Sequence, residues 1–126
     1  MSGEAARYLY RADLLGQVGD EHTIRMISFE PVLDDMGGTE AIADALHRNR
    51  IGWAISGGEG GWSARPAKAK WFKGIRDAAV GSGEPYFHKQ HGGRGVTEAA
   101  KLGGHRATLD GLLWKQIPAV KQLSLL

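Results

Sequence analysis

Three short apolar runs alternate with helical patterns along this chain, and that alternation restricts the fold more than any other feature of the sequence. The runs cover residues 24–29, 51–56 and 85–89, and each is rich in side chains that favour strands. Their nearly continuous apolar character is typical of parallel strands that are covered on both faces. Helix followed by strand, three times over, predicts an α/β fold with three parallel strands alternating with helices.

The segments between the runs have the spacing of amphipathic helices. The first covers residues 4–18, where apolar side chains recur at steps of three and four. The second begins with Thr39 as its N-cap and ends near Asn49. The third begins around Pro66, because proline suits the first helical position, and ends at Gly81.

The end of the chain has a weaker pattern. We interpret all 126 residues as one domain, with a βα core over residues 1–92 and an irregular C-terminal strap over residues 93–126. Within the strap, "LDGLLW" at 109–114 is expected to pack as a turn. Three parallel strands leave two open edges, which proteins usually protect. We expect the strap to cover one edge, and a homo-oligomer or a second protein chain to cover the other.

Composition excludes several classes of protein. The chain has no cysteine, so within this chain it holds no disulfide, thiolate nucleophile or cysteine-ligated iron–sulfur cluster. A net charge of +2, dispersed along the sequence, permits a nucleic-acid partner without requiring one. No apolar run approaches the roughly 20 residues of a membrane span, and the first residues lack the apolar core of a signal peptide. We therefore expect a cytoplasmic protein without a membrane partner.

Polar residues follow each of the three predicted strands. They are Glu30, then Gly57-Gly58-Glu59, then Lys89-Gln90-His91. In parallel sheets, ligands collect at the carboxyl ends of the strands. The sequence therefore predicts a binding site where these three strand ends meet.

Glycines dominate the second strand end. Positive φ at Gly57, Gly58, Gly60 and Gly61 would turn backbone N–H groups outward into an anion nest. Ser63 and the start of the following helix would add to that site. Packing alone is the alternative, because the segment has neither a Walker pattern nor a dinucleotide-binding fingerprint.

Two carboxylates and two cations are the charged candidates at the carboxyl ends of the predicted strands. Glu30 and Glu59 are candidates for catalysis, as a base or as acceptors for a substrate amine. Arg65 can present a bidentate fork to phosphate or carboxylate, and Lys89 with Gln90 can orient the same ligand. The alternative for the two acids is that they form ion pairs with Arg65 or Lys89. The alternative for Lys89 and Gln90 is that they are solvated residues at the rim of the site.

Histidine, tryptophan and lysine residues offer weaker signals. His88-x-x-His91, with His105 downstream, resembles a zinc site, but on a strand the first two would face opposite sides, so we expect no metal. Trp53 and Trp71 are expected in the core. Two further features are open to two interpretations: Trp62 as a lid or an exposed contact, and the basic cluster Arg65, Lys68, Lys70 and Lys73 as a solvated helix face or a nucleic-acid contact.

Several segments together resemble one protein family. They are "ISFEPVL" at 27–33, "WAISGGEGGWSARP" at 53–66, Trp71, "PYFHKQHG" at 85–92 and "LDGLLWKQIP" at 109–118. The chain is similar to a phage and prophage family of unknown function whose members resemble radical-SAM barrel proteins and carry a three-cysteine motif near the N-terminus. The similarity covers only the C-terminal half of such a barrel, and the family favours aromatic residues where this chain has His88 and His91.

The resemblance implies part of a (β/α) barrel without its cysteine-bearing half. It favours a phage-encoded ligand-binding or protein-interaction module, non-catalytic alone, that acts on a host nucleic-acid-processing or defence system in the host cytoplasm. One alternative is the C-terminal half of a split radical-SAM-like enzyme, in which S-adenosylmethionine would bind only if a partner chain completes the barrel. Another is a nucleic-acid-binding protein. The "GGE" of this chain follows a late strand, so the cofactor contact made by such a motif elsewhere is not transferred to Glu59.

Overall fold

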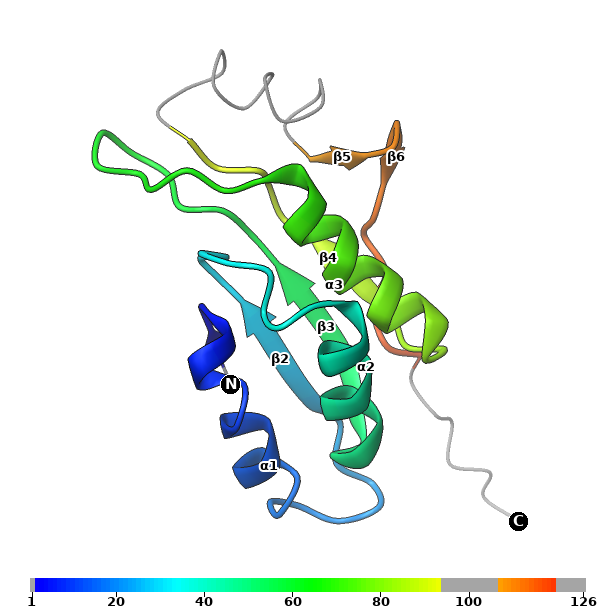
Figure 1. Ribbon diagram of the computed structural model, residues 1–126. Helices are drawn as coiled ribbons and strands as arrows, with labels where there is room; N and C mark the ends of the chain where they lie inside the picture. Colours follow the sequence, from blue (N-terminus) through cyan, green and yellow to red (C-terminus); the bar gives the residue numbers. More distant parts are fainter. Residues whose placement is uncertain (1, 94–106, 120–126) are drawn as a thin grey trace.

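The computed structural model describes residues 2–93 and 107–119 and shows an α/β fold that is not closed into a barrel (Figure 1). A parallel sheet has the strand order β1-β2-β3-β4, and its members are β1 (Ser2–Gly3), β2 (Arg25–Phe29), β3 (Ile51–Ser56) and β4 (Tyr86–His88). The three predicted strands are therefore confirmed. The edge strand β1 was not predicted, because two residues are too short to show a period.

The helices follow the predicted order with different ends. The first predicted helix is a 3₁₀ turn, η1 (Ala6–Tyr8), followed by α1 (Arg11–Leu15). In α2 (Thr39–Arg48), Gly38 takes the N-cap position and Thr39 is the first helical residue, so the predicted cap is wrong by one position.

The third helix, α3 (Ala69–Gly81), begins later than predicted. Residues 64–68 approach it as a loop, in which Ala64 and Ala67 are buried. Pro66 therefore lies in the loop and not at the first position of the helix, so that prediction is wrong.

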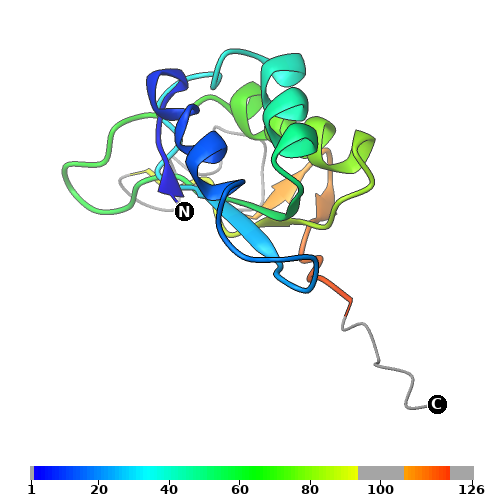
Figure 2. The ribbon, with the colours of Figure 1, turned by 90° about the horizontal axis from the view of Figure 1, so that it is seen from below.

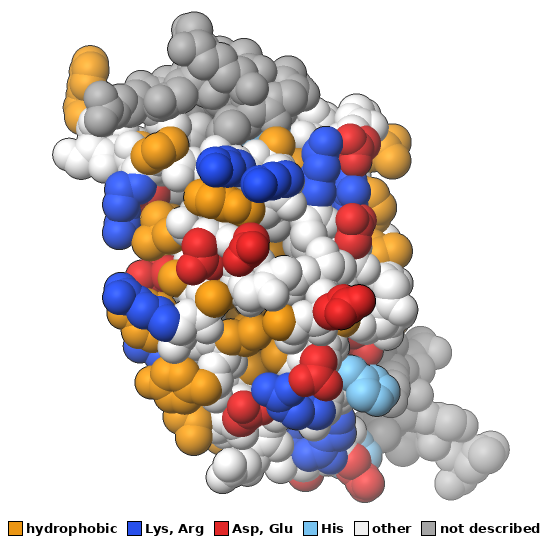
Figure 3. Space-filling view, viewed as in Figure 1, with side chains coloured by type: hydrophobic (Ala, Val, Ile, Leu, Met, Phe, Trp, Pro, Cys, Tyr) orange, Lys and Arg blue, Asp and Glu red, His pale blue; other side chains and the backbone are white. Residues whose placement is uncertain are grey.

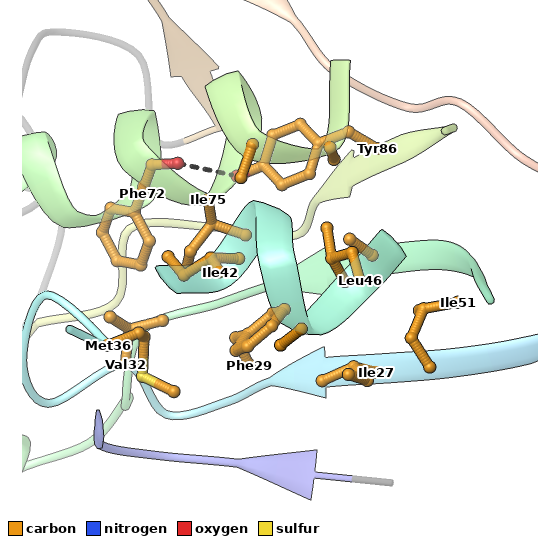
Figure 4. Close-up of a cluster of buried hydrophobic side chains, with 14 of the residues drawn as sticks. Ile27, Phe29, Val32, Met36, Ile42, Leu46, Ile51, Phe72, Ile75 and Tyr86 are labelled. Carbon is orange, nitrogen blue, oxygen red and sulfur yellow. Dashed lines mark hydrogen bonds between the residues drawn. The ribbon is translucent and has the colours of Figure 1, made fainter. Parts of the chain in front are cut away.

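The core lies between the sheet and the two long helices (Figure 4). Ile27 and Phe29 point from β2 toward Ile42 and Leu46 of α2, and α3 adds further apolar side chains. Burial alternates along β2, so one face of that strand is fully covered and the other is not. All described helices lie on the same side of the sheet (Figure 2). The expectation of strands covered on both faces is therefore wrong for the part of the chain described.

The strap covers the β4 edge of the sheet, as predicted. A small antiparallel hairpin comes first, with β5 (Thr108–Leu109) and β6 (Leu112–Leu113) joined at Asp110. Salt bridges from Lys73 and Arg76 of α3 to Asp110 hold it in place. The next residues run antiparallel to β4, where His88 N donates to the Trp114 carbonyl at 2.8 Å. Two parts of the predicted strap, residues 94–106 and 120–126, lie outside the described residues.

Candidate functional site

The carboxyl ends of the three predicted strands lie side by side at one end of the sheet, as the sequence predicts. Gly57 N donates to the Phe29 carbonyl at 3.0 Å, and Lys89 N donates to the Ser56 carbonyl at 2.8 Å. The predicted site residues nevertheless form two groups. One, Glu30 with Lys89, lies on the uncovered face of the sheet, and the other, Glu59 with Arg65, closes the loop after β3.

A hollow of about 350 Å³ occupies the uncovered face of the sheet. Its walls come from alternate positions of β2, β3 and β4, because side chains on one face of a strand recur every second residue. The lining residues are Met26, Ser28, Glu30, Trp53, Ile55, Phe87 and Lys89. We call these seven side chains the open face.

Trp53 belongs to the open face and not to the core. Its ring meets Phe87 edge to face at 6.4 Å between centroids, and its indole N–H donates to the Gln116 carbonyl at 3.1 Å. The prediction that Trp53 is a core residue is therefore wrong, whereas Trp71 does pack partly buried against the core.

Glu30 and Lys89 form an ion pair at the carboxyl end of the open face. The Lys89 ammonium lies 3.0 and 3.1 Å from the two Glu30 carboxylate oxygens, and the Ser28 hydroxyl donates to the same carboxylate at 3.2 Å. A Cβ at Gly57 would come within 2.9 Å of Glu30 Oε1. The absence of a side chain at Gly57, directly after β3, therefore gives the Glu30 carboxylate the space in which it pairs with Lys89.

Glu59 and Arg65 close the loop between β3 and α3. The Glu59 carboxylate accepts from the backbone N–H of Arg65 at 2.8 Å and from its Nε and Nη2 at 2.9 Å each. These bonds hold the pKa of Glu59 at about 2, well below its usual value. Glu59 is therefore ionised near neutral pH, and the guanidinium fork of Arg65 is taken up inside the chain.

Gly57 and Gly58 in this loop serve close packing. Positive φ occurs at Gly61, but not at Gly57, Gly58 or Gly60, so the expected nest conformation is absent at those three positions. Gly58 N donates to the Gln90 carbonyl at 2.9 Å, and a Cβ at Gly58 would lie only 1.8 Å from the His91 carbonyl oxygen. The N–H groups of Gly57 and Gly58 are therefore engaged in backbone hydrogen bonds.

The remaining predicted residues surround this contact. Gly60 forms a bridge with Gly93, Ser63 is exposed on the loop, and the Gln90 side chain is half-buried beside it. Trp62 in this loop is 90% exposed, and its contact with a partner stays a prediction.

The predicted basic cluster is already partly paired. Arg65 bonds to Glu59, and Lys73 bonds to Asp110 at 2.8 Å. Lys68 lies over the Trp71 ring, with its ammonium 5.5 Å from the centroid. The cluster therefore offers a nucleic acid less positive charge than the sequence indicates.

A chain of buried polar side chains lies beneath the site on the helix side of the sheet. The Tyr86 hydroxyl lies 2.5 Å from Ser56 Oγ, which is 2.9 Å from His88 Nδ1, and His88 Nε2 lies 3.0 Å from His91 Nδ1. All four side chains are at most 1% exposed. Burial lowers the pKa of His88 to about 3, so its ring is neutral near pH 7.

The expectation that His88 and His91 face opposite sides is wrong. β4 ends at His88, so the alternation of a strand does not extend to His91, and the chain turns back beneath Phe72. Across residues 2–93 and 107–119, no group of three or more potential ligands among His, Cys, Asp and Glu could hold a metal ion.

Lys115 is a residue of this region that the sequence did not indicate. Its ammonium donates to the carbonyls of His88 and Lys89 and lies 4.6 Å from the centre of the Phe87 ring. Burial lowers the pKa of Lys115. A lysine in an irregular tail gives no pattern by which this position could have been found.

Comparison with known proteins places the chain in a family without giving an activity. Residues 3–118 match the model of DUF5131, which is described as a protein of unknown function. The chain belongs to the DUF5131 family. No curated protein and no solved structure matches it. Membership of a family of unknown function is thus confirmed, whereas the phage and radical-SAM parts of the resemblance stay predictions. No helix in the described parts of this DUF5131 member is long and apolar enough to cross a membrane.

Proposed function

We propose that this DUF5131 member is a protein-interaction module, non-catalytic alone, and that a second protein chain packs over its open face. The observation that carries the proposal is the 350 Å³ hollow, with its four apolar side chains on three adjacent strands. Parallel sheets are normally covered on both faces. The described helices cover only one face here, which leaves the other for a partner.

The polar groups of the open face support a protein partner over a small ligand. Small-molecule sites join apolar walls to a few polar groups that are free to orient the ligand. Here Glu30 and Lys89 bond to each other, and the Ser28 hydroxyl donates to that carboxylate. A ligand that used either charge would have to break this pair, whereas an apolar surface can pack beside it.

Neither candidate acid is placed for catalysis by this chain alone. A general acid or base works best with a pKa near the working pH. The pKa of Glu59 is about 2, and Arg65 occupies both of its oxygens. Glu30 is paired with Lys89. The resemblance to phage proteins makes a host protein of nucleic-acid processing or defence, in the host cytoplasm, the partner class that we propose.

The second candidate function is half of a split barrel enzyme, and the sheet itself favours it. β1 is the last strand at its edge, and the face beside it is uncovered, as they would be in an incomplete barrel. The chain has no cysteine, so its residues do not fit an iron–sulfur cluster, and any thiolate ligands would have to come from the partner. S-adenosylmethionine would then bind only to the two chains together.

The experiment is site-specific photo-crosslinking in the cell that carries the gene. A benzophenone amino acid replaces Ile55 on the open face or, as the matched control, Val80, which is 45% exposed on α3. We expect one discrete protein adduct from position 55 and none from position 80. The adduct is identified by mass spectrometry, and a cysteine-bearing barrel half would favour the second candidate.

Binding of the purified partner then completes the test. By calorimetry, Ile55→Glu should weaken the complex at least tenfold, because it places a charge in an apolar contact. Val80→Glu should leave the affinity unchanged. Equal adducts at both positions, or full affinity of Ile55→Glu, would rule out the open face as the docking surface.

A further inference from the structure

A second apolar surface runs along α1 and its flanking residues, with Tyr10 directly before the helix, Leu14 within it and Val18 three residues beyond its end. Tyr10, Leu14 and Val18 follow one another at steps of four residues and are 57%, 58% and 59% exposed. In the space-filling view, hydrophobic side chains gather over α1 at the lower left, beside Lys and Arg side chains (Figure 3). We call these three residues the α1 stripe.

Single exposed apolar side chains are common, but the α1 stripe belongs to a segment that is apolar on two sides. Ala12 is fully buried, and Leu9 and Leu15 pack against the core. A helix that is apolar on one side only would present polar residues outward. The segment around α1 is therefore suited to being covered by another surface on its outer side as well.

The charges at the two ends of the α1 stripe have opposite sign. Arg7 precedes the stripe and Arg11 directly follows Tyr10, its first residue. Both guanidinium groups stack on the Tyr8 ring, at 4.8 and 4.4 Å from its centroid. Asp20 and Glu21 follow it and are exposed. Among the described residues neither arginine has an ion pair, and Glu21 lies beside His22 alone, at 3.4 Å.

We propose that a second copy of this chain docks on the α1 stripe. In a two-fold symmetric pair the same patch meets itself, so a patch must complement its own reversed image. A stripe with cations at one end and acids at the other does this when the two copies lie antiparallel. Leu14 then packs near the centre, and the arginines of each copy face Asp20 and Glu21 of the other.

This pairing is independent of the proposed function, because α1 lies on the helix side of the sheet and the open face on the other. Each copy keeps its own open face. A monomeric chain that binds a partner, or a dimer that binds none, would therefore separate the two proposals.

The first test is sedimentation equilibrium of the full chain over a range from micromolar to millimolar. We expect a concentration-dependent dimer that weakens as salt is added, since exposed charges are screened. Leu14→Glu should weaken it at least tenfold, and Val80→Glu, the matched control on α3, should not. A chain that stays monomeric throughout, or a dimer unchanged in Leu14→Glu, would overturn the proposal.

A charge-reversal pair keeps the test valid if Leu14→Glu impairs folding. One variant carries Arg7→Glu and Arg11→Glu, and the other carries Asp20→Lys and Glu21→Lys. Each alone brings like charges together at both ends of the pair and should stay monomeric, whereas an equimolar mixture should form a heterodimer. A mixture that associates no better than its components would refute the antiparallel arrangement. Circular dichroism checks that all variants are folded.

Discussion

Gly58→Ala is the sharpest test of the contact between the loops that follow β3 and β4. An added Cβ would lie 1.8 Å from the His91 carbonyl oxygen and 2.5 Å from its carbon. Both are backbone atoms, so no side-chain rotation relieves the clash. Ordinary contact at 3.4 Å requires a separation larger by 1.6 Å. That shift would break the hydrogen bond from Gly58 N to the Gln90 carbonyl, now 2.9 Å long.

The expected cost combines three effects. Two backbone hydrogen bonds join these loops, from Gly58 N to Gln90 O and from Gly93 N to Glu59 O, and each contributes about 1 kcal/mol. Overpacking adds about 1–3 kcal/mol. Alanine offsets about 0.4–1 kcal/mol of this by restricting the unfolded chain. We expect a loss of about 2–5 kcal/mol in the free energy of unfolding, or roughly 10–15 °C in Tm.

The assay is urea unfolding, with Gly60→Ala as the matched control. Gly60 lies two residues away in the same loop, its φ is not positive, and an added Cβ would meet nothing closer than Gln90 Nε2 at 3.9 Å. This control should be as stable as the natural chain or more stable by up to about 1 kcal/mol, because alanine restricts the unfolded chain. Equal stability of the two variants would show that the two loops do not pack as described.

Three further predictions concern the charged and buried polar groups. Because Arg65 lowers the pKa of Glu59 to about 2, its bonded carboxylate stabilises the fold above pH 4.5 and loses this effect as the pH falls toward about 2. The urea midpoint of Glu59→Gln should lack that part of the pH dependence, and an unchanged profile would contradict the pairing. Ser56→Ala leaves His88 Nδ1 without its buried partner and should cost about 1–3 kcal/mol in urea unfolding, so a neutral result would be inconsistent with the buried chain. Lys115→Met removes the two side-chain bonds from Lys115 to the carbonyls of His88 and Lys89, so the His88 amide should exchange hydrogen faster, and unchanged exchange would argue against this link.

Local patterns were enough to predict most of the sheet and α2. Strand composition and helical spacing depend on neighbouring residues, so β2, β3 and β4 were found within about two residues of their ends. The start of α3 was missed, because burial of Ala64 and Ala67 holds the preceding segment in a loop. That burial depends on contacts distant in sequence, which a helical pattern does not contain.

The site shows the same division between local and distant information. The meeting of three strand ends follows from parallel topology and was predicted. The role of Gly58 was left open between ligand binding and packing, because the answer depends on how closely His91 approaches. The apolar run at 51–56 indicated that Trp53 would be buried. Its actual exposure depends on which face of the sheet the helices cover, and the described helices all lie on the other face.

The contacts within the loop after β3 bear on which kind of partner the protein has. Glu59 is bonded to Arg65, and the Gly57 and Gly58 N–H groups are bonded to backbone carbonyls. A small anionic ligand at this edge would have to displace these internal bonds before it formed its own. A protein surface that packs over Trp53 and Phe87 breaks none of them and gains about 25 cal/mol for each Å² of apolar area removed from water. Under the proposed function, the strand ends therefore fix the framework, and the apolar open face would supply the energy for binding.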